Sequence, residues 1–172
     1  MAKITIRESR EQKLLKNEKH LLRTLIETIP DSVWLKDTDG NYITCNLRFE
    51  KFIGAKEADL IGKSDYDFFT KELAEFFRQK DKEALQSGKP NTNLEWVTFA
   101  DDGHRELLET IKTPMYSSDG KLIGILGIAR DITKRHLAEE ALKESEKNIN
   151  IFLRTTLFPC GYLMIKRLNF SK

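Results

Sequence analysis

Histidines and cysteines are the side chains through which this chain could carry out acid–base, nucleophilic or metal chemistry. His20 and His136 stand in charged helical segments, and His104 stands beside a turn. Cys45 and Cys160 form no disulfide framework and no metal-binding pattern. We find no Ser/His/Asp or Cys/His arrangement with the spacing of a catalytic site. The sequence therefore predicts no enzyme activity and no metal site in this chain. We expect each of the three histidines to be a solvated polar residue.

His136 raises one more specific possibility, a phosphoacceptor of the histidine-kinase kind. Such residues stand in patterns like H-E-L-R-T-P-L, whereas "HLAEEALK" lacks the acidic residue directly after the histidine and the proline five residues on. The chain also lacks nucleotide-binding glycine boxes, a GGDEF loop and a DNA-reading helix pair. Any kinase or cyclase activity must therefore reside in another part of a parent protein.

The bulk properties set the class of partner that we expect. With a net charge of +2 among 172 residues, the chain is too evenly charged to indicate a nucleic-acid partner. The longest strongly apolar run, "LIGILGIA", has eight residues, compared with roughly 20 for a membrane-spanning helix. The amino terminus lacks the apolar region of a secretory signal. We expect a cytoplasmic location and no membrane segment.

Three Asp-Gly pairs, at 39–40, 102–103 and 119–120, divide strand-like runs at the positions of tight turns. They predict two strands before a central helical region and three after it, with the last strand between Lys121 and Asp131. In the longest central helix an apolar face is predicted, comprising Leu73, Phe76, Phe77, Ala84 and Leu85. This order predicts an α+β fold, an antiparallel sheet with helices on one face.

Charged helices are predicted on both sides of this core. Residues 1–29 carry Leu15, Leu22, Leu25 and Ile29 at coiled-coil-like spacing before Pro30 ends the helix. Residues 134–152 form a second amphipathic helix, whose seam comprises Ala138, Leu142, Ser145, Ile149 and Phe152. These helices could pair between protomers or cover the open face of their own sheet, and both remain possible.

The element order, with "DTDGNYITCNLRFEKFIG", "ADLIGKSDYDFF" and the closing "GIARDIT", resembles a PAS domain of bacterial signalling proteins. The resemblance covers about residues 22–133, and the PAS domain is assigned to residues 30–133. It implies a sheet and helices that enclose a cavity for a small molecule or cofactor. It also implies flanking helices that pair in a homodimer and pass a signal to an effector domain, such as a histidine kinase or a diguanylate cyclase.

The resemblance also bears on cofactors. Flavin photosensors of this family need a cysteine in a GxNCRFLQ motif, but the corresponding "GKSDYDFF" has Ser64 and Asp65 and no thiol. Haem-binding members take a histidine from the long helix, and residues 70–88 contain none. The sequence thus argues against a flavin–cysteinyl adduct and against haem, and it leaves the ligand unknown.

Strand alternation and aromatic content select the residues of the predicted cavity. Ile123, Ile125, Gly127 and Ala129 share one face of the last strand, and their small members leave room against the helices. The full set of candidate cavity residues is Trp34, Asn46, Tyr66, Phe68, Phe69, Phe77, Trp96, Thr98, Ile125, Gly127 and Ala129. The predicted cavity is mostly apolar with few polar anchors. A filled core without ligand remains the alternative.

The junction "DIT", Asp131, Ile132 and Thr133, joins the last strand to a helix without an intervening loop. We predict that it transmits strain from the cavity wall to the helix, with Thr133 as N-cap and Asp131 as a second cap or ion-pair partner. Residues 153–172 contain no acidic residue and loosely repeat 22–36, which indicates a truncated second PAS-like unit or an unstructured tail. The alternative to a sensor is a ligand-free PAS scaffold for dimerisation.

Overall fold

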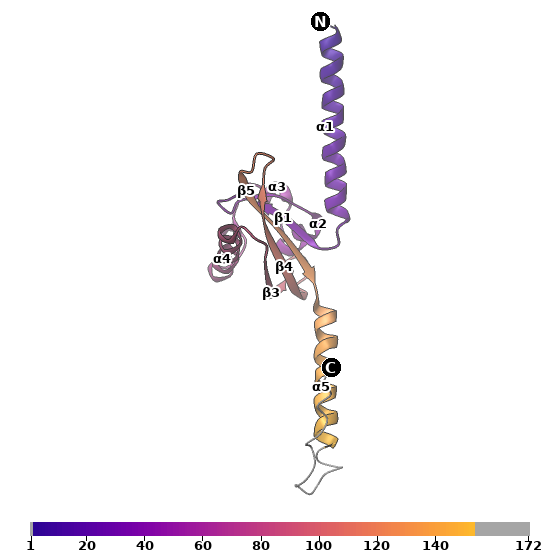
Figure 1. Ribbon diagram of the computed structural model, residues 1–172, viewed down its shortest axis with the longest axis vertical. Coiled ribbons are helices and arrows are strands. Elements are labelled where there is room, and N and C mark those ends of the chain that lie inside the picture. The colour runs from indigo at the N-terminus through magenta and orange to yellow at the C-terminus, as the bar shows by residue number, and fades with distance from the viewer. Residues whose placement is uncertain (1, 154–172) are drawn as a thin grey trace, which may run out of the picture. The chain divides into compact units, whose positions relative to one another are not determined.

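A five-stranded antiparallel sheet is the centre of the structure, a computed structural model that describes residues 2–153, with side chains from residue 10 onward (Figure 1). The spatial order of the strands is β2-β1-β5-β4-β3. The strands are β1 (Ser32–Lys36), β2 (Tyr42–Cys45), β3 (Asn91–Thr98), β4 (Arg105–Tyr116) and β5 (Leu122–Asp131). The α+β prediction, the five strands and the position of the last strand are confirmed.

The Asp-Gly pairs form the turns that define this order. Gly40, Gly103 and Gly120 all have positive φ angles, and their turns join β1 to β2, β3 to β4 and β4 to β5. The last strand then lies between β4 and β1, where Ser32 pairs with Ala129. The first and last strands of the sheet are therefore neighbours, although almost a hundred residues separate them.

Four short or medium helical segments connect β2 to β3. They are α2 (Leu47–Ile53), α3 (Glu57–Leu60), the 3₁₀ turn η1 (Asp65–Asp67) and α4 (Lys71–Ser87). Helices α2 and α4 contact the sheet, and Trp34 of β1 stacks on Phe49 of α2 with ring centroids 4.8 Å apart. This aromatic layer joins the helices to the sheet and supplies most of the apolar core.

The buried face of α4 differs from the predicted one. Ala74, Phe77, Asp81 and Ala84 are buried, whereas Leu73 and Phe76 are each 38% exposed. The buried positions recur at steps of three and four residues, as a helix face requires, but one of them is an aspartate. The apolar pattern predicted Phe77 and Ala84 correctly, but it missed Asp81 because it assigns no charged residue to the interior.

Long helices precede and follow this core in the sequence. Helix α1 spans Ala2–Thr28 and helix α5 spans Thr133–Phe152, and the chain divides into two compact units after Thr133. No helix within residues 2–153 is long and apolar enough to cross a membrane. The predicted second PAS-like unit or tail lies, from residue 154 on, outside the described residues.

Replacement of Gly127 tests the packing of the central strands. A Cβ atom at Gly127 would lie 2.2 Å from Cε2 of Trp34, so the indole must move when any side chain is added. We expect Gly127→Ala to lower the free energy of unfolding by about 1–3 kcal/mol, measured by urea denaturation. In a Trp34→Leu background the same substitution should cost much less. An equal cost in both backgrounds would show that the indole is not the obstacle.

Candidate functional site

A small interior cavity lies between the sheet and the helices. Its volume is about 20 Å³, compared with the roughly 10–15 Å³ that one water molecule needs. The lining residues come from the strands and from the helical segments, and they combine aromatic with charged side chains. They are Ser32, Trp34, Lys36, Tyr42, Phe49, Phe52, Asp65, Phe69, Phe77, Glu95, Val97, Leu108, Thr110, Lys112 and Ala129.

Strand alternation explains why polar residues line this cavity. Every second residue of β1 and of β4 faces the helices, so Ser32 and Lys36 of β1 and Thr110 and Lys112 of β4 point inward. Ala129 of β5 pairs with both Ser32 and Thr110 and carries only a methyl group. The short Ala129 side chain therefore leaves interior space between Ser32 and Thr110, its neighbours on β1 and β4.

Two lysines and two aspartates form a buried ionic network beside the cavity. The Lys36 ammonium lies 2.5 Å from Oδ2 of Asp65 and 3.1 Å from Oδ2 of Asp81, and Lys112 lies 2.6 Å from Oδ1 of Asp81. Lys112 also donates to the carbonyl of Phe77 at 3.0 Å. All four charged residues are at most 3% exposed. Two positive and two negative charges balance, as burial requires.

Burial and ion pairing act in opposite directions on the pKa values of these groups. Burial favours the neutral carboxyl of Asp81, but the Lys36 and Lys112 ammonium groups outweigh it and hold the Asp81 pKa below its usual value. Burial lowers the pKa of Lys112, although the Asp81 carboxylate opposes this shift. Burial, followed by the charge of Asp65, raises the pKa of Tyr42, whose hydroxyl donates to Asp65 at 2.6 Å.

Two oxygen atoms of the cavity lining lack hydrogen-bond partners in the described part of the chain. Oγ of Ser32, a residue only 1% exposed, has no hydrogen-bond partner among the described residues, and neither has Oε2 of Glu95. The other oxygen of Glu95 accepts a hydrogen bond from the Thr110 hydroxyl at 2.9 Å. Burial raises the pKa of the Glu95 carboxyl, and the Thr110 hydroxyl, the charge of Lys112 and the Asn93 side chain offset this only in part. An unpaired buried polar atom is costly, so both groups favour a bound molecule.

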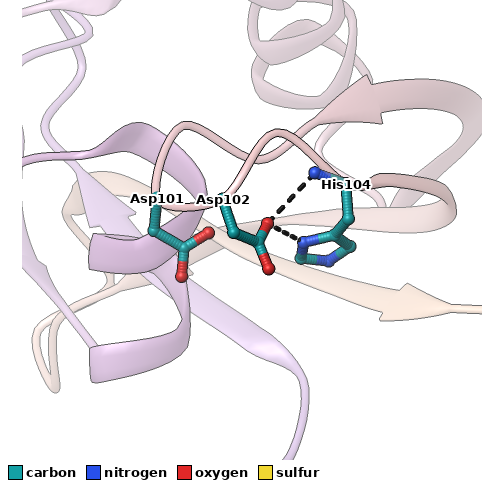
Figure 2. A group of neighbouring side chains, drawn as sticks. All are labelled: Asp101, Asp102 and His104. Atoms are coloured by element: carbon teal, nitrogen blue, oxygen red, sulfur yellow. Dashed lines mark hydrogen bonds and ion pairs between the residues drawn. The ribbon is translucent and has the colours of Figure 1, made fainter.

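A second cluster of ionisable residues lies in the turn between β3 and β4 (Figure 2). Oδ1 of Asp102 accepts a hydrogen bond from the backbone N–H of His104 and contacts its ring nitrogen Nδ1. The imidazole stacks on Phe99, and its Nε2 lies 3.0 Å from Glu106. Asp101, Asp102 and His104 are exposed, and the turn itself accounts for the bonds of Asp102 and His104. We infer no metal site from them.

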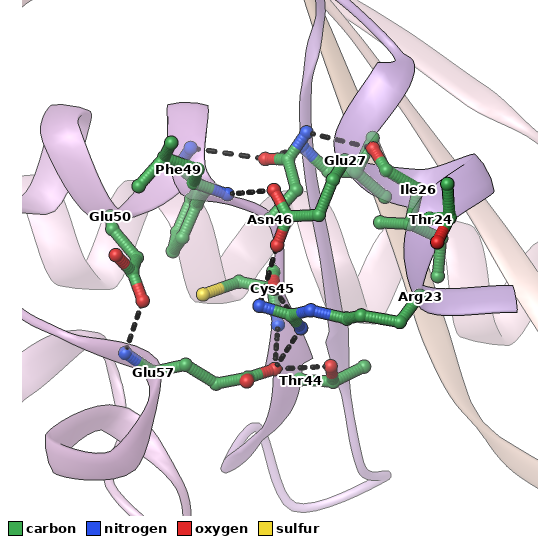
Figure 3. Close-up of polar contacts among 12 residues, drawn as sticks. Arg23, Thr24, Ile26, Glu27, Thr44, Cys45, Asn46, Phe49, Glu50 and Glu57 are labelled. Carbon is green, nitrogen blue, oxygen red and sulfur yellow. Dashed lines mark hydrogen bonds and ion pairs between the residues drawn. The ribbon is translucent and has the colours of Figure 1, made fainter. Parts of the chain in front are cut away.

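The carboxyl-terminal end of α1 is attached to the core by polar contacts (Figure 3). Arg23 donates to the carbonyl of Cys45 at 2.9 Å and to Glu57 at 2.8 Å, and Glu57 also accepts from the Cys45 N–H at 3.0 Å. Glu27 accepts from the N–H of Leu47 at 2.8 Å. Burial, then the Glu57 and Glu50 carboxylates, raises the pKa of the Cys45 thiol to about 12, so this cysteine is structural.

The junction after β5 is hydrogen-bonded to β4. The N–H of Ile132 donates to the carbonyl of Leu107 at 2.9 Å, and the N–H of Leu107 donates to the Thr133 hydroxyl at 2.8 Å. The Asp131 carboxylate accepts from the N–H of Thr133 at 2.8 Å. Thr133 is thus the first helical residue and a link to the sheet. The prediction that it is the N-cap was wrong, and Asp131 provides the cap.

Comparison with known proteins identifies the fold. A family model described as the PAS fold matches residues 26–137, about two thirds of the chain.

The chain belongs to the PAS family.

Relatives of this PAS domain are signalling proteins. The aerobic respiration control sensor protein ArcB of Escherichia coli is 28% identical over 134 residues, which are 78% of this chain and 17% of ArcB. The methanogenesis regulatory histidine kinase FilI of Methanothrix harundinacea is 34% identical over 126 residues, or 73% of this chain and 14% of FilI. The chain spans less than a fifth of the length of both relatives, and it is a sensor module of the PAS type.

A solved structure shares both fold and sequence with this PAS domain. A VqmA–ligand–DNA complex from Vibrio cholerae is 26% identical, with a TM-score of 0.59, over 64% of this chain and 50% of that one.

The structure brings together only part of the predicted cavity set. Trp34, Phe69, Phe77 and Ala129 line the cavity. Ile125 and Gly127 lie on the inner face of β5 without lining it, and Phe68 packs against the core from a partly buried position. Of the face of β5 that was predicted to point inward, Ile125, Gly127 and Ala129 are buried, whereas Ile123 is 39% exposed.

Four predicted residues lie elsewhere. Trp96 and Thr98 are exposed on the outer face, because the inward phase of β3 belongs to Glu95 and Val97. Tyr66 is 53% exposed. Asn46 is buried, but its carbonyl oxygen accepts from the N–H groups of Val33 and Phe49, so it caps α2. Their assignment to the cavity was wrong.

The charged wall of this PAS cavity was missed. Lys36 stands two residues after Trp34 and Lys112 two residues after Thr110, the spacing of one strand face. Asp81 follows Phe77 by four residues, the spacing of one helix face. These spacings could have placed the charges inward, but the residue types indicated solvent. Most residues of the cavity lining are apolar, as predicted, but its charged residues were not predicted.

Asp81 neutralisation tests the ionic network. Asp81→Asn leaves two buried ammonium groups with one carboxylate, and we expect it to lower the free energy of unfolding by about 3–5 kcal/mol in urea denaturation at neutral pH. The double variant Asp81→Leu with Lys112→Met should cost less than Asp81→Leu alone, because it removes both members of a pair. Asp59→Asn, on the exposed face of α3, is the matched control. A cost below about 1 kcal/mol for Asp81→Asn would contradict the network.

The β3–β4 turn gives a pH-dependent signal. Hydrogen bonds from His104 to Asp102 and Glu106 raise the pKa of the imidazole, so the stabilisation from these contacts is complete at acidic pH and is lost as pH rises through that pKa. We expect NMR titration to place the His104 pKa above the usual value of about 6.5. Asp102→Asn should lower it, whereas Asp59→Asn should not. An unchanged pKa in Asp102→Asn would exclude this pairing.

Proposed function

We propose that this PAS domain is a sensory module that binds a small molecule in the interior cavity. The observation that carries this proposal is a pair of oxygen atoms in the cavity lining, Oγ of the buried Ser32 and Oε2 of the partly buried Glu95, which lack hydrogen-bond partners among the described residues. A module that served only as a scaffold would gain stability if its interior were apolar. The unpaired groups are instead typical of a site that a polar ligand completes.

The route from cavity to output is short in the proposed mechanism. Ala129 in the cavity wall stands two residues before Asp131, and Leu108, also in the wall, follows Leu107, to which the junction is hydrogen-bonded. A ligand that changes the spacing of β4 and β5 would change the hydrogen bonds that join Leu107 to Ile132 and to Thr133. We propose that the Asp131–Thr133 junction passes this change to α5 and then to an effector domain of the parent protein, such as a histidine kinase or a diguanylate cyclase.

A second connection lies at the same end of the sheet as the junction. Arg130 of β5 donates to Asp31 at 2.9 Å and 3.1 Å, and Asp31 directly precedes β1 and follows Pro30 at the end of α1. Arg23 ties α1 to Glu57 in α3. We propose that a ligand in the cavity also changes the position of α1. The Arg130–Asp31 and Arg23–Glu57 pairs connect it to β5, which holds a cavity residue, and to α3, which neighbours such elements.

Homodimerisation through the flanking helices is part of the same proposal. The described part of α1, together with the residue Ile29 just after it, has a stripe of apolar side chains that are between 37% and 67% exposed. These are Leu14, Leu15, Leu21, Leu22, Leu25 and Ile29. VqmA of Vibrio cholerae, a structural neighbour, has been solved as a dimer. If the cavity binds nothing, dimerisation of a scaffold is the remaining function, and in either case we propose that the chain has no enzyme activity of its own.

Native mass spectrometry of the chain purified from its source tests ligand binding. We expect a stoichiometric extra mass in the wild-type protein, and its loss in Ala129→Leu, because three added carbon atoms exceed the free space above Ala129. Ala138→Leu, on the exposed surface of α5, should retain the mass. A folded wild-type protein that dimerises without any extra mass would contradict the sensor and favour the scaffold.

The junction is tested by the Thr133 hydroxyl. Thr133→Ala leaves the N–H of Leu107 without its acceptor, and we expect a loss of stability of about 1–2 kcal/mol and faster hydrogen exchange at that amide. Thr133→Ser keeps the hydroxyl and is the control. In the full-length parent, Thr133→Ala should change effector output beyond the change that its lower stability explains. Output that follows stability alone in both variants would contradict a relay at this junction.

A further inference from the structure

The charges around the cavity do not balance when Glu95 is included. Lys36 and Lys112 are matched by Asp65 and Asp81, so Glu95 is a third carboxyl against two ammonium groups. A carboxylate in such a place needs a partner of opposite charge or must take up a proton. One bound cation would therefore neutralise the excess negative charge of the site, whereas a bound anion would increase it.

Ser32 lies on the same inner face of the sheet and complements Glu95. Ser32 pairs with Ala129, and Ala129 pairs with Thr110, whose hydroxyl holds Glu95. The two unpartnered oxygen atoms belong to Ser32 of β1 and Glu95 of β3, and Ala129 of β5 and Thr110 of β4 lie on the strands between them. A serine hydroxyl and a carboxylate oxygen both accept hydrogen bonds, so they suit a ligand that carries several N–H donors.

The rest of the wall restricts the size and character of this ligand. The cavity holds about 20 Å³, which limits a ligand to a few heavy atoms unless side chains move. Trp34, Phe52 and Phe69 present aromatic rings to it, and aromatic faces attract cations. Lys36 and Lys112 already lie 4.9 Å and 5.7 Å from the ring centroids of Tyr42 and Phe77.

We propose that the cavity binds a small organic ammonium ion, which pairs with Glu95 and donates a hydrogen bond to Ser32. This inference rests on the proposed sensory function and specifies its ligand class. Where Glu95 is protonated in the free protein, the ammonium ion enters as R–NH₃⁺ and the Glu95 proton leaves to solvent, so charge and atoms balance.

Binding of such a cation depends on pH in a defined direction. The groups that face Glu95 are Thr110 and Lys112 of β4, Asp81 of α4 and Asn93 of its own strand. Together with burial they leave the Glu95 pKa raised, so the carboxylate that the cation needs forms as pH rises through that value. Affinity for the ammonium ion should rise over the same pH range.

Three probes of equal or similar size distinguish the ligand classes in an NMR titration of the full chain. They are ethylammonium chloride, ethanol as its neutral isostere, and sodium acetate as an anion. We expect ethylammonium alone to shift the resonances of Ser32, Ala129 and Thr110, with the roughly millimolar affinity that a three-atom ligand can reach. Glu95→Gln should weaken it at least about tenfold, Ser32→Ala about two- to tenfold, and Glu72→Gln, on the exposed side of α4, should not change it.

The outcomes separate the ligand class from the function. Equal binding of ethanol, or acetate binding through Lys36 and Lys112, would overturn the ammonium proposal and leave a ligand-binding cavity. Failure of all three probes in the wild-type chain, with no extra mass in the protein from its source, would overturn both. Ethylammonium binding that survives in Glu95→Gln would show that the cation lies elsewhere.

Discussion

The pairing of the Asp81 carboxylate with two buried ammonium groups is the constraint on which the rest of this structure depends. Asp81 belongs to α4, Lys36 is the last residue of β1, and Lys112 lies in the middle of β4. One carboxylate thus joins three elements that are distant in sequence. Neither lysine can be left unpaired in the interior, because an isolated buried charge costs several kcal/mol. The network therefore fixes how α4 lies across the sheet, more specifically than apolar contacts would.

The same constraint explains why charged residues line part of the cavity and why the cavity lies close to the junction. Lys112 and Thr110 stand on one face of β4, and the same strand continues to Leu107, to which Ile132 and Thr133 are hydrogen-bonded. A change in the position of β4 thus acts on both the ionic network and the start of α5. Because the pKa of Asp81 is lowered in the folded state, the stabilisation from this carboxylate is present at neutral pH and is lost as pH falls through that pKa.

The sequence predicted the fold through features with a local physical cause. Asp-Gly pairs suit turns with positive φ angles, and they located the hairpins and the span of the last strand. The candidate site was harder, because the side chains that define it are charged and their burial depends on partners from other elements. Asp81 is explained only once α4 lies over β1 and β4, and the inward phase of β3 is set by pairing with β4, where Glu95 stands opposite Leu108. Likewise, the Thr133 hydroxyl could cap an isolated helix, but in this fold it accepts a hydrogen bond from the N–H of Leu107 in β4.

A high-resolution crystal structure of the full chain purified from its source tests most directly whether the balanced network keeps a polar ligand site open. We expect Asp81 between Lys36 and Lys112, and density for a bound molecule above Ala129 that contacts Oγ of Ser32 and Oε2 of Glu95. A structure in which protein side chains fill this space, with Ser32 and Glu95 hydrogen-bonded to protein groups, would contradict a ligand site. Separation of Asp81 from either lysine would contradict the network itself.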